Sequence, residues 1–177
     1  MTADLTETQL MQVRQYVAQL GPGKSKENFF AGKCGEVAVH NYGYATKSYS
    51  NLCGFDLYRS VLSDPKHADS GADLVLQSEE KPYVRLFAQV KTITSGRGTN
   101  LLLSKSLYDE KLDYYNGIPQ DVFIVVRKLS ESTYDILGFI TKADAFKHYV
   151  EDKPVKGCYC IDTMWLRPIE ELKGLLS

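Results

Sequence analysis

Apolar side chains recur at helical spacing through the first forty residues of the chain. Between positions 5 and 20 they fall every three or four residues, and the pattern stops at the Gly-Pro-Gly sequence of 21–23, which predicts a first helix. Ser25 is a suitable N-cap for a second helix, predicted to run to about His40. This second helix carries Glu36 near its C-terminal half.

Two short extended runs follow later, at 71–77 and 83–91. The segment that joins them is polar and ends in Pro82, which is typical of a hairpin connection, so the two runs are expected to pair antiparallel. Successive strand side chains point to opposite faces. Gln89 and Lys91 are therefore expected to share one face, with the residue between them on the other.

The rest of the chain continues the mixture of helical and extended patterns. Strands are predicted at 121–127, 134–140 and 158–162, and helices from about 104 to 115, after Thr141 and from Pro168. The segment 41–66 has no clear period and is interpreted as irregular. This order predicts an α/β protein with a mixed central sheet covered on both faces.

Composition narrows the class of protein. With 177 residues, of which 44% are apolar, the chain can fill the core of one domain, and we predict a single domain over 1–177. Lys and Arg (21) balance Asp and Glu (22), so total charge does not indicate a nucleic-acid binder. No apolar run is long enough to cross a bilayer, and the N-terminal segment is acidic, so a soluble, cytoplasmic protein without a membrane partner is expected.

The four cysteines, at 34, 53, 158 and 160, have no zinc-finger spacing and are interpreted as reduced structural thiols. Cys158 and Cys160 are expected on one face of a short strand, the buried one. Metal or redox chemistry at this pair is the alternative, and stoichiometric zinc in the purified protein would support it.

The predicted hairpin brings three polar side chains onto one surface: Asp73 from the first strand, and Gln89 and Lys91 from the second. Burying such groups is unfavourable unless they are paired or bind something. A carboxylate and an amide oxygen beside an ammonium group are suited to a divalent cation. This surface is therefore the candidate site.

The order of these residues resembles the PD-(D/E)xK nuclease superfamily, which has the restriction-endonuclease-like fold. The resemblance covers about 25–140 and is carried by Glu36, by Asp73 after Gly71 and Ala72, and by Gln89 and Lys91 two positions apart. It implies a Mg²⁺ site, with Mn²⁺ as a possible substitute. The implied ligands are Glu36, Asp73, Gln89 and the main-chain carbonyl of Val90, and Lys91 would orient or activate the attacking water.

Two positions depart from the family pattern. Ala72 stands where the family name has Pro, which matters little because the following Asp is the ligand. Gln89 replaces the second acid, so only Asp73 and Glu36 would offset the charge of the metal. The resemblance implies a metal-dependent DNA endonuclease that cuts duplex or branched DNA and, by analogy with the family, acts as a homodimer. The alternative is a non-catalytic nucleic-acid-binding or assembly subunit that keeps the nuclease fold.

Charge distribution adds a candidate nucleic-acid surface. Residues 81–108 include five Lys or Arg and no Asp or Glu. The loop 95–100 has small residues and hydroxyls, among them Ser95 and Thr99, that suit close approach of phosphates, with Arg97 as the charged contact. Lys105 follows this loop as a further candidate contact. A solvated loop is the alternative interpretation of this segment.

Overall fold

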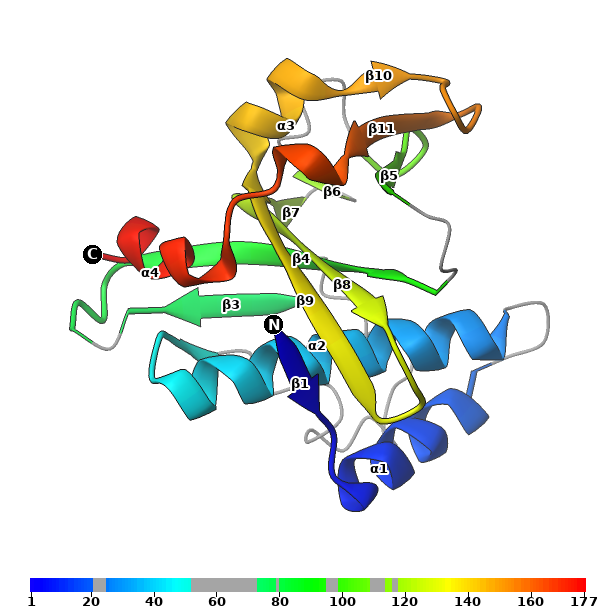
Figure 1. Ribbon diagram of the computed structural model, residues 1–177, viewed down its shortest axis with the longest axis vertical. Coiled ribbons are helices and arrows are strands. Elements are labelled where there is room, and N and C mark those ends of the chain that lie inside the picture. Colours follow the sequence, from blue (N-terminus) through cyan, green and yellow to red (C-terminus); the bar gives the residue numbers. More distant parts are fainter. Residues whose placement is uncertain (21–24, 52–72, 79, 95–98, 109–113, 116–117) are drawn as a thin grey trace.

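Figure 1 shows the computed structural model of the chain. The structure describes residues 1–20, 25–51, 73–78, 80–94, 99–108, 114–115 and 118–177. The predicted positions Cys53, Ser95 and Arg97 and the start of the first hairpin strand, 71–72, lie outside these residues.

A six-stranded mixed sheet forms the centre of the molecule. Its strands in spatial order are β1 (Thr2–Asp4), β9 (Thr133–Thr141), β8 (Val122–Lys128), β4 (Arg85–Ile93), β3 (Leu74–Gln77) and β2 (Ser50–Asn51). Strands β4 and β8 are parallel, and every other neighbouring pair is antiparallel. The predicted hairpin is confirmed as β3 and β4, with Leu74 opposite Ala88.

Two helices, α1 (Glu7–Ala18) and α2 (Lys26–Thr46), cover one face of this sheet (Figure 1). Thr6 caps α1 in a capping box, and the Ser25 side chain accepts a hydrogen bond from the Asn28 amide, as predicted for the start of α2. Helix α2 continues to Thr46, six residues beyond the predicted end at His40. Part of the segment interpreted as irregular is therefore helical.

The other face carries a smaller antiparallel sheet. Its strands are β10 (Val150–Glu151), β11 (Cys158–Asp162) and β5 (Asn100–Ser104), and helix α3 (Lys142–His148) packs beside it. Thr141 caps α3, as predicted. The remaining elements are β6 (Tyr114–Tyr115), β7 (Ile118–Pro119), η3 (Thr163–Trp165), η4 (Ile169–Glu171) and α4 (Leu172–Leu175).

Strand β8 separates two hydrophobic cores. Val122, Ile124 and Val126 belong to the core under α1 and α2, whereas Phe123 and Val125 belong to the core under the smaller sheet. The molecule is an α/β protein with a mixed sheet packed against helices, plus a small antiparallel sheet. The predicted fold class is confirmed, except that strands as well as a helix cover the second face.

The helix predicted from about 104 is wrong in the described residues. Ser104 ends strand β5, and a turn follows at 105–107. Leu101 and Leu103 are buried and Leu102 is exposed, which is the period of a strand. The pairing of β5 with β11 determines this conformation, because it places both leucines in the core.

The prediction for the cysteine face was also wrong in part. Strand β11 directs Tyr159 and Ile161 into the core, so Cys158 and Cys160 lie on its opposite face. Cys160 is nevertheless buried, with its thiol near the Val155 carbonyl, while Cys158 is half-buried. Cys34, Cys158 and Cys160 are free thiols. Among the helices that the structure describes, none has the length and apolar character to cross a membrane.

Candidate functional site

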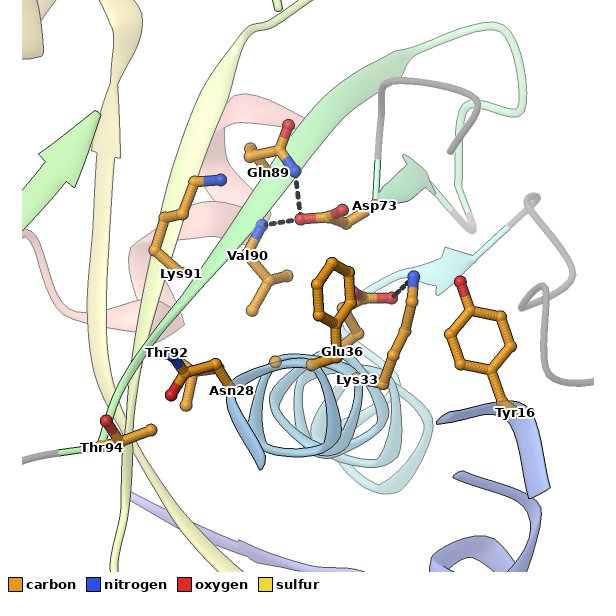
Figure 2. A pocket seen from close by; sticks show the side chains of 12 residues that line it. Tyr16, Asn28, Lys33, Glu36, Asp73, Gln89, Val90, Lys91, Thr92 and Thr94 are labelled. Carbon is orange, nitrogen blue, oxygen red and sulfur yellow. Dashed lines mark hydrogen bonds and ion pairs between the residues drawn. The ribbon is translucent and has the colours of Figure 1, made fainter. Parts of the chain in front are cut away.

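Strand β4 presents its two faces to different surroundings at residues 89–91. Val90 packs into the core beside α2, and Gln89 and Lys91 point away from that helix (Figure 2). The shared face predicted for Gln89 and Lys91 is confirmed. Gln89 is nearly fully buried and Lys91 half-buried.

Asp73 lies immediately before β3 and binds the neighbouring edge of β4. Its Oδ2 accepts a hydrogen bond from the Val90 amide at 2.7 Å and another from the Gln89 side-chain amide. The N–H and C=O groups of one strand residue point to the same side of the strand. The Val90 carbonyl therefore points to the side on which Asp73 lies, where the predicted ligand set needs it.

The Gln89 side chain presents an oxygen with no hydrogen-bond partner. A carboxylate only accepts hydrogen bonds, so the contact with Asp73 requires the Gln89 NH₂ group and fixes the orientation of the amide. Its Oε1 is then left as a buried acceptor without a partner among the described residues. An unsatisfied buried acceptor is unfavourable and needs an explanation. Figure 2 shows this oxygen at the end of the amide away from Asp73, so the amide would have to turn for the oxygen to bind a cation held by Asp73.

Helix α2 brings an ion pair to the other side of the site. The Lys33 ammonium lies 2.9 Å from Glu36 Oε2, and the two side chains are only 12% and 10% exposed. Helix spacing of three residues places them together. Helix α2 lies close to the sheet at this point, because a Cβ at Gly35 would clash with Thr92 Oγ1 and lie 2.8 Å from Val126 Cγ2.

These groups line one pocket of about 440 Å³. Figure 2 shows Glu36 and Lys33 on α2, Asp73 at the edge of β4, and Gln89 and Lys91 on the strand itself. The full lining is Tyr16, Asn28, Phe29, Gly32, Lys33, Glu36, Asp73, Gln89, Val90, Lys91, Thr92 and Thr94. The five residues predicted for catalysis or metal binding thus meet in one pocket. Their roles stay predictions.

Burial and charge act against each other at Lys33. Burial alone would lower the pKa of its ammonium group, but the nearby carboxylates of Glu36 and Asp73 outweigh it, and the net pKa lies well above the ordinary value. Lys33 is therefore positively charged throughout the neutral range. The same ammonium is influenced by both carboxylates, which indicates that Glu36 and Asp73 share one electrostatic environment.

The two lysines of the pocket have different neighbours. The Lys91 ammonium lies 5.7 Å from the centre of the Tyr108 ring, a cation–π contact on the face turned away from α2. Lys33 lies 5.4 Å from the centre of the Tyr16 ring. Each ammonium group is held by an aromatic ring on its own side of β4.

Of the predicted nucleic-acid contacts, the two that the structure describes, Thr99 and Lys105, do not line the pocket. Ser95 and Arg97 lie outside the described residues. Thr99 is exposed and does not line the pocket. Lys105 lies in the turn after β5, where its ammonium pairs with Glu151 and, at 2.9 Å, with Asp152. These acids offset the charge of Lys105, and its contact with nucleic acid stays a prediction.

Sequence reasoning missed Lys33 and Tyr16 as members of the pocket. Lys33 precedes Glu36 by three residues on a helix, a spacing that indicates an ion pair and that would have found it. Tyr16 comes from α1, and nothing in its sequence context indicates this place.

The available ligand atoms suit a hard divalent cation. Asp73, Glu36, the Gln89 Oε1 and the Val90 carbonyl all offer oxygen, which Mg²⁺ and Mn²⁺ prefer. The described residues contain no group of three or more His, Cys, Asp or Glu side chains that could hold a metal. A cation in this pocket would therefore depend on amide and main-chain oxygens beside two carboxylates.

Comparison with known proteins gives no relative: no family model, curated protein or solved structure matches this chain.

Proposed function

We propose that this protein is a divalent-metal-dependent endonuclease of the PD-(D/E)xK superfamily that hydrolyses phosphodiester bonds in DNA. One observation carries the proposal. Glu36, Asp73, Gln89 and Lys91, in the family's order along the chain, line the same pocket, where Asp73 also binds the Val90 amide. Two carboxylates beside an amide and a main-chain carbonyl supply the oxygen ligands that a divalent cation prefers.

The protein groups have separable roles in this reaction. Asp73, Gln89, Glu36 and the Val90 carbonyl would hold Mg²⁺, which supplies Lewis-acid polarisation of a phosphate oxygen and a more acidic bound water. Lys91, on the opposite face of β4 from α2, would donate a hydrogen bond to the attacking water or to the developing negative charge. Asp73 also binds the Val90 amide, so it fixes the strand edge that presents the Val90 carbonyl.

Cleavage of plasmid, single-stranded and branched DNA with Mg²⁺ or Mn²⁺ tests the proposal directly. We expect wild-type protein to cut at least one substrate, and Asp73→Asn and Lys91→Ala each to lower the rate by about 100-fold or more. Lys156→Ala is the matched control, because Lys156 is exposed between β10 and β11, lies outside the basic stretch 81–108 and does not line the pocket. Cleavage that survives both pocket substitutions would refute the proposal.

One observation favours a second candidate, a nucleic-acid-binding or assembly subunit without catalysis. The pocket's two carboxylates face two lysines, and Glu36 is already paired with Lys33. In that case every DNA substrate would stay uncut, while metal-independent DNA binding, measured by fluorescence anisotropy, would be unaffected by Asp73→Asn.

A further inference from the structure

Lys33 occupies an unusual position for a lysine. Its side chain is only 12% exposed, and its ammonium contacts Glu36 Oε2 at 2.9 Å beside the Tyr16 ring. Lysine is rarely buried to this extent without a partner that holds its charge. Here it lies on the same side of β4 as Glu36, whose carboxylate is one of the predicted metal ligands (Figure 2).

The charges of the pocket conflict with a retained ammonium. The described lining residues contribute two carboxylates, Asp73 and Glu36, and two ammonium groups. The carboxylates already offset Lys33 and Lys91. A divalent cation beside a stationary Lys33 would place like charges close together in a poorly solvated pocket, where their repulsion is strong. If the Lys33 ammonium moves out of the pocket, the metal binds without this repulsion.

The surroundings of Lys33 leave room for such a movement. Lys33 lines the pocket of about 440 Å³, so space for another rotamer of its side chain lies beside it. The lysine stem is flexible and its head is strongly hydrated in water, so it can turn outward at moderate cost. Lys91 differs, because it lies on the far face of β4 against Tyr108.

We propose that Lys33 is an internal counter-cation of the candidate site: its ammonium neutralises the pocket carboxylates in the metal-free protein, and a divalent cation binds by displacing it. This inference rests on the metal site of the proposed function. It makes Lys33 a residue that regulates metal affinity, acting through Glu36 rather than on the substrate. In the metal-free protein, the Lys33 ammonium also reduces the repulsion between the carboxylates of Glu36 and Asp73.

Mn²⁺ affinity of the full chain, measured by the loss of the free-ion signal in electron paramagnetic resonance, tests this role. We expect Lys33→Met to bind Mn²⁺ at least tenfold more tightly than wild type, and Lys33→Arg, which keeps the charge, to stay near wild type. Lys26→Met removes the same charge from an exposed position of α2 and is the matched control, expected to change affinity less than threefold. Unchanged or weaker binding by Lys33→Met, or no Mn²⁺ binding by either wild type or this variant, would overturn the proposal.

Wild-type protein provides a second test that does not depend on the folding of a variant. Acetylation of lysines by an N-hydroxysuccinimide ester, read by mass spectrometry, reports the exposure of each ammonium group. We expect Mg²⁺ to increase modification of Lys33 several-fold and to leave Lys26 unchanged. Protection of Lys33 that persists at saturating Mg²⁺ would contradict displacement. A protein that binds Mn²⁺ as expected but cuts no DNA would refute the nuclease and leave the counter-cation role intact.

Discussion

Gln89 determines what the candidate site can bind, because the amide has a donor end and an acceptor end. Asp73 accepts a hydrogen bond from the donor end, and the acceptor end, turned away from Asp73, has no partner among the described residues. A second carboxylate at this position would add charge for a metal, but it would also face Asp73 without a hydrogen atom between them. The amide therefore stabilises the site in the metal-free protein, but it attracts a cation less strongly than a carboxylate would.

Substitution of this residue separates the two effects. We expect Gln89→Glu to lower the free energy of unfolding of metal-free protein by about 1 to 3 kcal/mol, since a hydrogen bond is replaced by carboxylate repulsion. Addition of Mn²⁺ should recover most of this loss, seen as a larger metal-induced rise in Tm than in wild type. Gln15→Glu, at an exposed position of α1, is the control. A Tm of Gln89→Glu that does not respond to Mn²⁺ would argue against a cation at this site.

Cys34, also on α2, makes stability depend on alkaline pH. Burial is the main cause that raises the pKa of its thiol from 9.0 to about 11. Unfolded protein loses this proton at lower pH than folded protein does, so the stability contributed by the neutral thiol is complete below pH 9 and is lost as pH rises from 9 to 11. We expect a fall of about 1 to 3 kcal/mol over this range in urea titrations.

Cys34→Ser removes the titrating group at that position and should flatten this fall. Burial also raises the pKa of the neighbouring Tyr134 hydroxyl, so a loss of stability above pH 10 remains in the variant. An equally steep fall between pH 9 and 10 in Cys34→Ser would show that another group is responsible.

At the scale of elements, the position of α2 depends on the absence of a side chain at Gly35. The helix carries both Lys33 and Glu36, and it approaches β4 and β8 so closely that a methyl group at Gly35 would clash with Thr92 and crowd Val126. The same helix has a second glycine, Gly32, that faces open space. The two glycines therefore provide a matched pair.

We expect Gly35→Ala to lower the free energy of unfolding by about 1 to 3 kcal/mol through overpacking. It should also weaken Mn²⁺ binding, because the displaced helix takes Glu36 away from Asp73. Gly32→Ala should instead raise stability by roughly 0.5 to 1 kcal/mol, as alanine favours the helix. Chemical denaturation and Mn²⁺ titration measure both. Equal effects of the two substitutions would show that the close approach at Gly35 has no consequence.

At the scale of the whole molecule, β8 joins two cores that would otherwise be independent. Its alternate residues belong to the helix-covered core and to the core of the smaller sheet. We therefore expect a single unfolding transition. Trp165, the one tryptophan of the sequence, follows β11 and reports on the smaller sheet, whereas far-ultraviolet circular dichroism is dominated by α1 and α2.

The two signals should coincide in wild type and in Val125→Ala, which should lose about 1 to 3 kcal/mol of stability. Val155→Ala, at an exposed position, is the control and should change little. A fluorescence transition at lower temperature than the change in circular dichroism would show that the smaller sheet unfolds separately.

Elements that depend on residues near in sequence were predicted correctly, and elements that depend on distant residues were not. Helices α1 and α2, the caps at Ser25 and Thr141, and the β3–β4 hairpin depend on nearby residues, and the sequence predicts them. Strand β5 depends on its pairing with β11, more than fifty positions later in the chain. The leucine run at 101–103 therefore did not by itself indicate a strand. For the site, the order of Glu36, Asp73 and Gln89 predicted the convergence. The orientation of the Gln89 amide and the burial of Lys33 depend on packing between elements and were not predicted.

The contact between Asp73 and Val90 has a consequence for how such a pocket can exist at all. In the register of β3 and β4, the Val90 amide would bond to the main chain of the residue before Asp73 if the ladder continued. A side-chain oxygen takes that amide instead. The carboxylate thus satisfies this donor at the point where the described part of β3 begins. If a main-chain carbonyl took this amide instead, strand pairing would extend along β4 and cover the part of the pocket that Asp73 lines. The pocket therefore depends on a side chain, and not the main chain, binding Val90.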